Sequence, residues 1–295
     1  MGSRPPIPES VKLRVRQKCG FCCIFCGNMI TQYEHVVPYE ICQEHAEENI
    51  VLLCANHHQE VTSGRLSKND VYARAKTPFS HFGRGHPYYR IPVREGSKVI
   101  FGNNIIDQFS FLTSEIGLVD FAGGTKLSVE ASEGFPKFSG SIHSFNGQEV
   151  LRFEENVITL RSMNVFDVSL QGKRFTVRAG ERRRIARFII DSSEFKVEDL
   201  KAFSPTSGVH VSRSGTYVLL PGGGYKVIGD NHYSGLVSNS KRINFISNTA
   251  GLYLANELPI PDIGHVWKWL FSAKNIKGAK GFEIGNRFNR VFVSG

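Results

Sequence analysis

The sequence lacks any long apolar segment. No stretch approaches the roughly eighteen consecutive apolar residues that a membrane span requires, and the polar N-terminal residues 1–18 lack the hydrophobic core of a secretory signal peptide. We therefore expect a cytoplasmic protein with no membrane partner. The compositional bias of disordered or fibrous chains is also lacking, because apolar residues make up 41% and charged residues 21% of the chain, as in ordinary globular proteins.

Cysteine is missing from everything after residue 54. The six cysteines all lie before that point: Cys19, Cys22, Cys23, Cys26, Cys42 and Cys54. In a reducing compartment, such clustering favours metal ligation over disulfide bonds. The N-terminal part of the chain is therefore predicted to bind metal. The remainder has no cysteine, so it is predicted to fold without disulfides and without metal ligands of this kind.

Four residues in this region have the spacing of a zinc site. Cys23 and Cys26 form a C-x2-C pair, and Cys54 and His57 form a C-x2-H pair further along the chain. Two tight turns that each present two ligands can surround a tetrahedral zinc ion at little cost in chain entropy. We predict a structural zinc ion on these four ligands.

The other cysteines and one histidine also fall into pairs with metal-like spacing, which leaves a second metal open. These are Cys19 with Cys22, and Cys42 with His45. Short Cys/His spacings arise by chance in a cysteine-rich segment, so free buried thiols are the favoured interpretation.

A further set of residues lies around these zinc ligands. Glu34 and His35 precede Val-Val-Pro38, Asn49 precedes the apolar run before Cys54, and His58 directly follows the last zinc ligand. This order resembles the HNH, or ββα-metal, endonuclease family over residues 23–58. It is also similar to the D-H-I-V-P stretch of the HNH domain in RNA-guided CRISPR effectors, with glutamate in place of the aspartate.

The resemblance implies an endonuclease that hydrolyses phosphodiester bonds in double-stranded DNA, in restriction or phage defence. His35 would be the general base, since an imidazole can take a proton from water near neutral pH. Glu34 and His58 would hold a catalytic Mg²⁺ or Mn²⁺ ion, and Asn49 would hydrogen-bond across the hairpin to fix the loop of His35. The cut would leave a 5′-phosphate and a 3′-hydroxyl.

Two alternatives remain open. A zinc ribbon that serves only binding or folding, as a catalytically silent nucleic-acid-binding or adaptor module, explains the four zinc ligands, but it does not require Glu34, His35, Asn49 or His58. An RNase is the other alternative. RNA and DNA are distinguished by groove shape and by the 2′-hydroxyl, neither of which this sequence reveals.

The chain is predicted to be α+β, with a small zinc-containing ββα-metal domain followed by a mainly β domain. We place the nuclease domain at residues 1–80, a Pro/Gly-rich linker at 81–95, and the β domain at 96–295, with a short helix over 263–275. The β domain, which resembles the β-rich tails of some bacterial HNH proteins, is expected to target or regulate cleavage, through an activating ligand or a protein partner.

Positive charge predicts a polyanionic partner. The net charge is +9 and the pI is about 9.3, which favours nucleic acid. The most basic stretch, residues 173–187, predicts phosphate contact or a sheet edge guarded by charge. A basic helix after the metal module, with Arg74 and Lys76, would face phosphates or only solvent.

Overall fold

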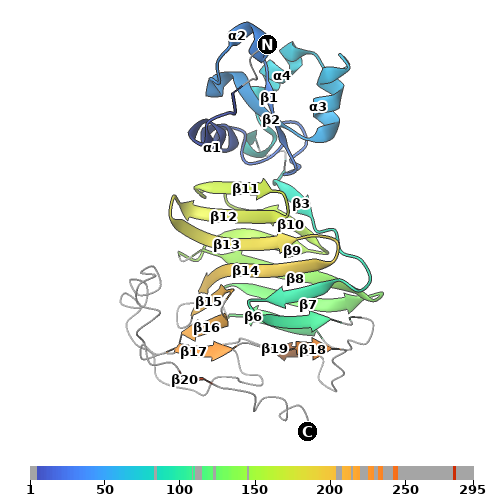
Figure 1. Cartoon of the computed structure of the whole chain (residues 1–295), viewed down its shortest axis with the longest axis vertical. Coiled ribbons are helices and arrows are strands. Elements are labelled where there is room, and N and C mark those ends of the chain that lie inside the picture. Colours follow the sequence, from blue (N-terminus) through green and yellow to red (C-terminus); the bar gives the residue numbers. More distant parts are fainter. Residues whose placement is uncertain are drawn as a thin grey trace.

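The structure is a computed structural model. It describes residues 5–82, 85–107, 109, 115–121, 124–144, 146–203, 208–213 and 215–219, and strands at 225–228, 232–234, 242–244 and 282–283. An N-terminal unit rich in helices is followed by a β sandwich (Figure 1). The α+β class with mostly β content is confirmed, since strands far outnumber helices among the described residues. The helix predicted over 263–275 lies outside the described residues.

The N-terminal unit is built on a two-stranded antiparallel sheet. Its elements are α1 (Glu9–Lys18), β1 (Gln32–His35), α2 (Tyr39–Cys42), η1 (Glu47–Asn49), β2 (Ile50–Leu53), α3 (Ala55–Thr62), α4 (Lys68–Ala75) and η2 (Phe79–Phe82). The Ile-Val-Leu-Leu run of β2 is buried throughout, and Val11 and Val15 of α1 belong to the same small core. Burial of β2 fixes the register of β1, which pairs His35 with Ile50.

The start of α4 is set by a capping box. The Ser67 hydroxyl accepts a hydrogen bond from the Asp70 amide at 3.1 Å, and the Asp70 carboxylate accepts one from the Ser67 amide at 3.1 Å. This reciprocal arrangement satisfies amides that a helix start leaves without partners. Lys68 therefore occupies the first turn of α4 and lies beside β1.

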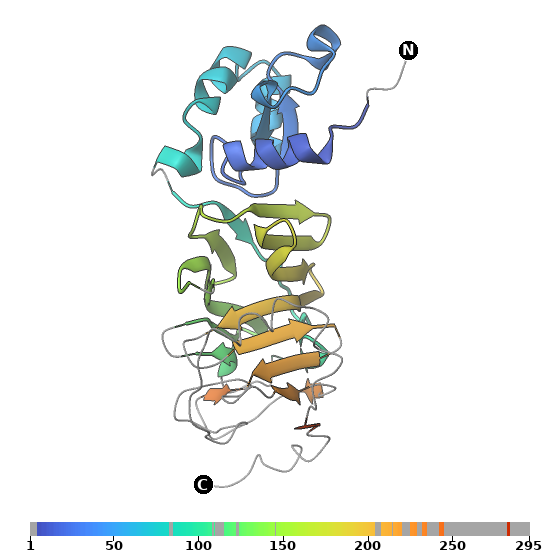
Figure 2. The same ribbon diagram turned by 90° about the vertical axis from the view of Figure 1, so that its left-hand side faces the viewer.

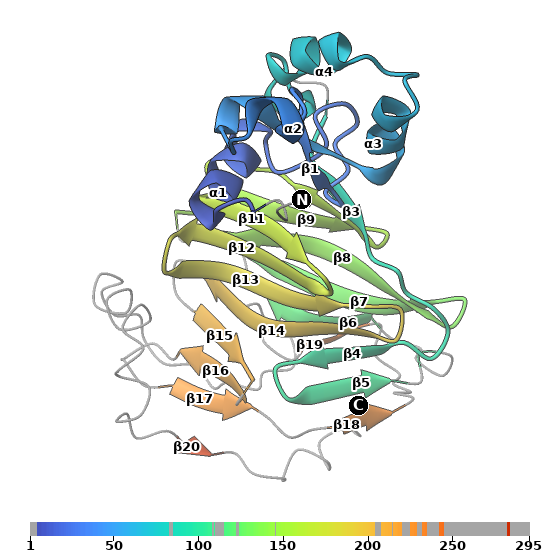
Figure 3. The same cartoon turned by 45° about the horizontal axis from the view of Figure 1, so that its top comes forward.

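The sandwich consists of two large sheets (Figure 3). The seven-stranded sheet has the order β19-β6-β7-β8-β9-β10-β3, with bounds Arg242–Asn244, Glu115–Asp120, Lys126–Ser132, Phe135–His143, Glu149–Glu154, Val157–Leu160 and Tyr88–Arg90. The eleven-stranded sheet runs β11-β12-β13-β14-β15-β16-β17-β20, with bounds Asp167–Gln171, Arg174–Gly180, Arg183–Ile190, Glu194–Phe203, Gly208–Ser212, Gly215–Leu219, Tyr225–Ile228 and Phe282–Glu283. It also includes β4 (Lys98–Phe101), β5 (Asn104–Asp107) and β18 (His232–Ser234).

Aromatic side chains fill the space between the two sheets. Phe138 of β8 lies 4.3 Å, centroid to centroid, from Phe195 of β14, and Phe153 of β9 packs edge-on against Phe188 of β13. All four rings are at most 1% exposed. Inner faces that interdigitate in this way define a face-to-face sandwich with one core.

The basic stretch over residues 173–187 forms β12 and β13, which lie inside the eleven-stranded sheet. The sheet-edge explanation for its charge therefore does not apply. Two of its guanidinium groups are partly neutralised, because Arg184 pairs with Asp199 and Arg187 pairs with Glu198. Contact with phosphate stays a prediction for this stretch.

The two units touch along α1 and β3 (Figure 2). Gln17 of α1 donates to the carbonyl of Phe166 at 2.8 Å, just before β11. The Tyr88 amide donates to the Gly27 carbonyl at 2.9 Å, so β3 bonds to the N-terminal unit while also pairing with β10. Residues 81–95, which the sequence marks as a linker, thus contain one strand of the sandwich.

Candidate metal centre and active site

The four predicted zinc ligands come from two turns. Cys23 and Cys26 flank a tight turn that ends at Gly27, whose φ of +83° is a conformation that suits glycine. A Cβ atom at that position would lie 2.5 Å from the ring of Phe79, so close packing also requires glycine there. Cys54 is the residue before α3, and His57 lies in the first turn of that helix.

The ligand atoms of these four residues lie within 4.8 Å of one another. The Cys23 sulfur is 3.5 Å and the Cys54 sulfur 3.1 Å from Nδ1 of His57, and the Cys26 and Cys54 sulfurs are 3.7 Å apart. Ligands around a tetrahedral zinc ion stand about 3.5–3.8 Å from one another. The expected grouping is confirmed, and the cluster could hold a zinc ion.

Two of the thiols in this cluster, Cys23 and Cys26, affect each other's pKa. The hydrogen bond from Cys26 lowers the pKa of Cys23 to about 5 against the opposing effect of burial, and the same bond raises the pKa of Cys26. A zinc ion bound here would favour the thiolate form of the three cysteines, so its binding would release thiol protons.

The other cysteines do not assemble into a second cluster among the described residues. The Cys19 sulfur accepts a hydrogen bond from the Leu52 amide, and burial raises the pKa of Cys19 to about 11. Burial likewise raises the pKa of Cys22 to about 12. Cys42 instead contacts Asn49, at 3.3 Å from Nδ2.

Glu34 and His58 meet between β1 and α3. The Glu34 carboxylate lies 3.0 Å from Nε2 of His58, and their side chains are 16% and 32% exposed. A carboxylate and an imidazole nitrogen that converge in this way can share a divalent cation. The structure therefore brings together the two residues predicted to hold the catalytic ion, and no third His, Cys, Asp or Glu completes a cluster with them in the described part of the chain.

His35 follows Glu34 at the end of β1 but faces another group of aromatic side chains. It is 5% exposed, and its Nε2 lies 3.2 Å from Nδ1 of His45. The Tyr39 ring packs edge-on against His35 and stacks on His45. On its other side, Nε2 of His45 lies 2.9 Å from the Pro5 carbonyl. The general base that the sequence predicts is thus covered by His45 and Tyr39.

Asn49 ties the loop after His35 to the start of β2. Its Oδ1 accepts a hydrogen bond from the Val37 amide at 2.6 Å, and its Nδ2 donates to the Val37 carbonyl at 2.9 Å. The Asn49 carbonyl also accepts a hydrogen bond from the Val36 amide at 2.8 Å. The amide side chain of Asn49 supplies both the donor and the acceptor of this two-way bridge.

Lys68 is the residue at this site that sequence reasoning did not assign a role. Its ammonium contacts the Glu34 carboxylate and donates to the His35 carbonyl at 2.7 Å. A capping signal at Ser67 predicts where α4 begins, but nothing local predicts that α4 lies beside β1. Arg74 of the same helix places its guanidinium 5.4 Å from the ring centroid of Phe25, which in turn stacks on His57.

Across the described residues, no helix is long and apolar enough to cross a membrane. Comparison of the chain with protein-family models, with curated proteins and with solved structures finds no match. The resemblance to the HNH family therefore rests on residues 23–58 alone.

Proposed function

We propose that the N-terminal unit is a metal-dependent HNH endonuclease that cleaves double-stranded DNA. The observation that carries this proposal is the meeting of Glu34 and His58 at 3.0 Å, with His35 as the next residue of the same strand. β1, β2 and α3 occur in the order strand, strand and helix, with α2 and η1 in the connection between the two strands. The Cys/His cluster joins the end of β2 to the turn before β1. The net positive charge of the chain favours a polyanionic substrate.

Each residue has a distinct task in this proposal. Glu34 and His58 hold Mg²⁺ or Mn²⁺, which supplies charge to stabilise the phosphorane-like transition state. His35 accepts the proton of the attacking water, and Asn49 positions the loop that carries it, through its two hydrogen bonds to Val37. The structural zinc holds the hairpin and α3 together.

Two contacts must change for this reaction. His45 has to leave Nε2 of His35 before water can reach that nitrogen, and Lys68 has to leave Glu34 before a cation can bind there. We propose that entry of the DNA and the ion displaces both. The sandwich then serves to target or regulate cleavage in response to a ligand or a protein partner.

The burial of His35 favours a second candidate, a zinc-stabilised nucleic-acid-binding module without catalysis. A histidine that is 5% exposed and bonded to His45 can have a purely structural part in the unit. This candidate, like the nuclease, predicts zinc content and affinity for DNA or RNA. Only cleavage separates the two.

The deciding experiment is plasmid cleavage by the full-length protein with Mg²⁺, Mn²⁺ or EDTA, for wild type, His35→Ala and the matched control His86→Ala. His86 is exposed and lies outside the site. We expect metal-dependent nicking that His35→Ala abolishes and His86→Ala retains. Parallel reactions with structured RNA test the RNase alternative. Absence of cleavage on every substrate, with DNA still bound in a gel-shift assay, would replace the nuclease with the binding module.

A further inference from the structure

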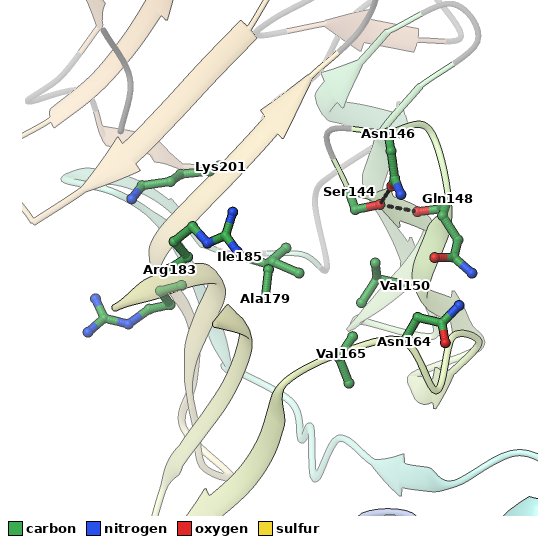
Figure 4. Close-up of a pocket in the computed structure, with 11 residues that line it drawn as sticks. Ser144, Asn146, Gln148, Val150, Asn164, Val165, Ala179, Arg183, Ile185 and Lys201 are labelled. Carbon is green, nitrogen blue, oxygen red and sulfur yellow. Dashed lines mark hydrogen bonds between the residues drawn. The ribbon is translucent and has the colours of Figure 1, made fainter. Parts of the chain in front are cut away.

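A second candidate site lies in the sandwich, at one end of the space between the two sheets (Figure 4). Its cavity encloses about 240 Å³. The lining comes from the hairpin between β8 and β9, the segment before β11, and strands β9, β12, β13 and β14. These elements contribute Ser144, Asn146, Gln148, Val150, Asn164, Val165, Ala179, Arg183, Arg184, Ile185 and Lys201.

The charge of this lining has one sign. Arg183, Arg184 and Lys201 contribute three cations, and no carboxylate lines the cavity. Arg184 does bind Asp199 through Nη1, but its Nε is buried and has no hydrogen-bond partner among the described residues. Arg184 is thus only partly neutralised, and Arg183 and Lys201 add to the positive charge of this wall. The cavity is therefore suited to an anion.

The opposite wall offers a different chemistry. In Figure 4, Asn146, Gln148 and Asn164 lie across the cavity from Arg183 and Lys201. Each amide offers a donor and an acceptor, which suits a ligand group that has both. The hairpin that carries Asn146 and Gln148 is closed by a backbone hydrogen bond, which the Ser144 amide donates to the Gln148 carbonyl at 2.8 Å.

Apolar side chains lie between the two polar walls. Val150, Val165 and Ile185 are 1%, 9% and 7% exposed, and Ala179 completes this surface. An apolar surface between a few converging polar groups is the usual composition of a small-molecule site. The cavity is slightly smaller than the roughly 300 Å³ at which sites for drug-sized ligands begin, so it can enclose only part of a ligand of that size.

We propose that this cavity binds a small phosphorylated ligand, with the phosphate on the Arg183, Arg184 and Lys201 wall and a hydrogen-bonding ring on the amide wall. A nucleoside monophosphate has this chemistry. The ligand can be a free nucleoside monophosphate or one nucleotide of a nucleic-acid strand. This site is made by the sandwich alone, so its binding test is independent of whether the N-terminal unit cleaves DNA.

The test measures binding to full-length, zinc-loaded protein by calorimetry and fluorescence anisotropy. The probes are inorganic phosphate, the nucleoside 5′-monophosphates, and single- and double-stranded oligonucleotides. The variants are Arg183→Gln, which changes an exposed side chain, and the double variant Arg183→Gln with Lys201→Gln. Arg182→Gln is the matched control, because Arg182 is exposed in the turn just before Arg183 but does not line the cavity.

We expect at least one monophosphate to bind, with affinity about tenfold lower in the double variant and unchanged in Arg182→Gln. In a second comparison, Asn164→Ala should weaken the monophosphate but leave inorganic phosphate unaffected. Binding of oligonucleotides alone, with the same dependence on Arg183 and Lys201, would identify the ligand as a nucleotide of a strand. The proposal is overturned if no phosphorylated probe binds, or if the double variant binds as the wild type does.

Discussion

Arg16 of α1 and Asp167 of β11 form a two-point ion pair that joins the N-terminal unit to the sandwich. Nε of Arg16 lies 2.7 Å from Oδ1 and Nη2 lies 2.9 Å from Oδ2 of Asp167, and these side chains are only 12% and 8% exposed. The third nitrogen, Nη1, donates to the Tyr33 hydroxyl at 2.8 Å. Because Tyr33 precedes Glu34 in β1, one guanidinium connects the sandwich to the strand of the candidate active site.

Removal of either partner of this pair should destabilise the protein. Asp167→Ala leaves a largely buried guanidinium without its counter-charge, which costs about 3 kcal/mol for buried pairs of this kind. The measurement is the free energy of unfolding in urea. Glu9→Ala, which removes an exposed ion pair with Lys12, is the control and should change stability by less than about 1 kcal/mol. An equal loss of unfolding free energy in the two variants would show that the pair between the units stabilises the protein no more than an exposed pair does.

The metal centre is the part of the site that the sequence predicts best. Cys23, Cys26, Cys54 and His57 lie in two short turns, so their spacing alone limits how the ligands can be arranged. The sequence also predicts that β structure dominates after residue 95, because short runs of alternating apolar residues and the turn residues between them are local signals. Both predictions depend on neighbours in sequence, and both agree with the structure.

The contacts that the sequence does not predict all join distant segments. Lys68 reaches Glu34 because α4 folds back over β1, and His45 reaches His35 because α2 turns the chain back toward the hairpin. The cavity in the sandwich brings together Asn164, in the segment before β11, and Lys201, in β14. Residue type and spacing carry no signal for such pairs, since packing of whole elements places them.

One zinc ion per chain is expected. Cys54→Ser should abolish it, because Cys54 supplies one of the four ligands, while Cys42→Ser should keep it, because Cys42 lies outside the cluster. Zinc content by atomic emission and thermal unfolding of the purified variants test this. Loss of the metal should also unfold the N-terminal unit, since metal binding stabilises the turns that hold it. Two zinc ions per chain, or loss of zinc in Cys42→Ser, would contradict the assignment.

Lys68 should oppose cation binding at Glu34 and His58. Its ammonium contacts the same carboxylate that a divalent ion would use, so the two cations compete. In zinc-loaded Lys68→Ala we expect Mn²⁺ to bind several-fold more tightly, as followed by electron paramagnetic resonance. Lys76→Ala is the control, because Lys76 lies over the Tyr72 ring instead. Weaker Mn²⁺ binding in Lys68→Ala would mean that Lys68 supports the ion site.

Two histidines of the sandwich should make the protein less stable in mild acid. Burial lowers the pKa of His143 below its ordinary 6.5, against the attraction of Glu149, and burial lowers the pKa of His210 against the attraction of Asp199. The unfolded chain therefore takes up these protons more readily than the folded one. The neutral imidazoles contribute their full stabilisation above about pH 6.5, and this contribution is lost as the pH falls below that value.

The measurement is the melting temperature between about pH 7.5 and pH 5.5, for wild type and for His143→Gln with His210→Gln. The double variant should show a smaller fall than the wild type across this range, whatever its stability at the higher pH. His86→Gln, at an exposed position, should fall as the wild type does. Identical pH dependence in all three proteins would assign the effect to other groups.

The short segment that precedes β11 connects the proposed ligand cavity to α1. Asn164 and Val165 line the cavity, the next carbonyl accepts the hydrogen bond of Gln17, and Asp167 binds Arg16. If the proposed ligand orders this segment, α1 should become more protected. We expect a saturating nucleoside monophosphate to slow hydrogen exchange in residues 9–18 and to leave residues 68–75 unchanged.

The variant Asp167→Asn tests whether that response passes through the ion pair. It keeps the shape of the side chain and does not alter the cavity lining, so the ligand should still bind with unchanged affinity. Its weaker bond to Arg16 should reduce the protection of α1, as measured by hydrogen exchange and mass spectrometry. Full protection of α1 in liganded Asp167→Asn would show that the response does not pass through the Arg16–Asp167 pair. Unchanged hydrogen exchange in the liganded wild type would show that ligand binding in the cavity does not affect the N-terminal unit.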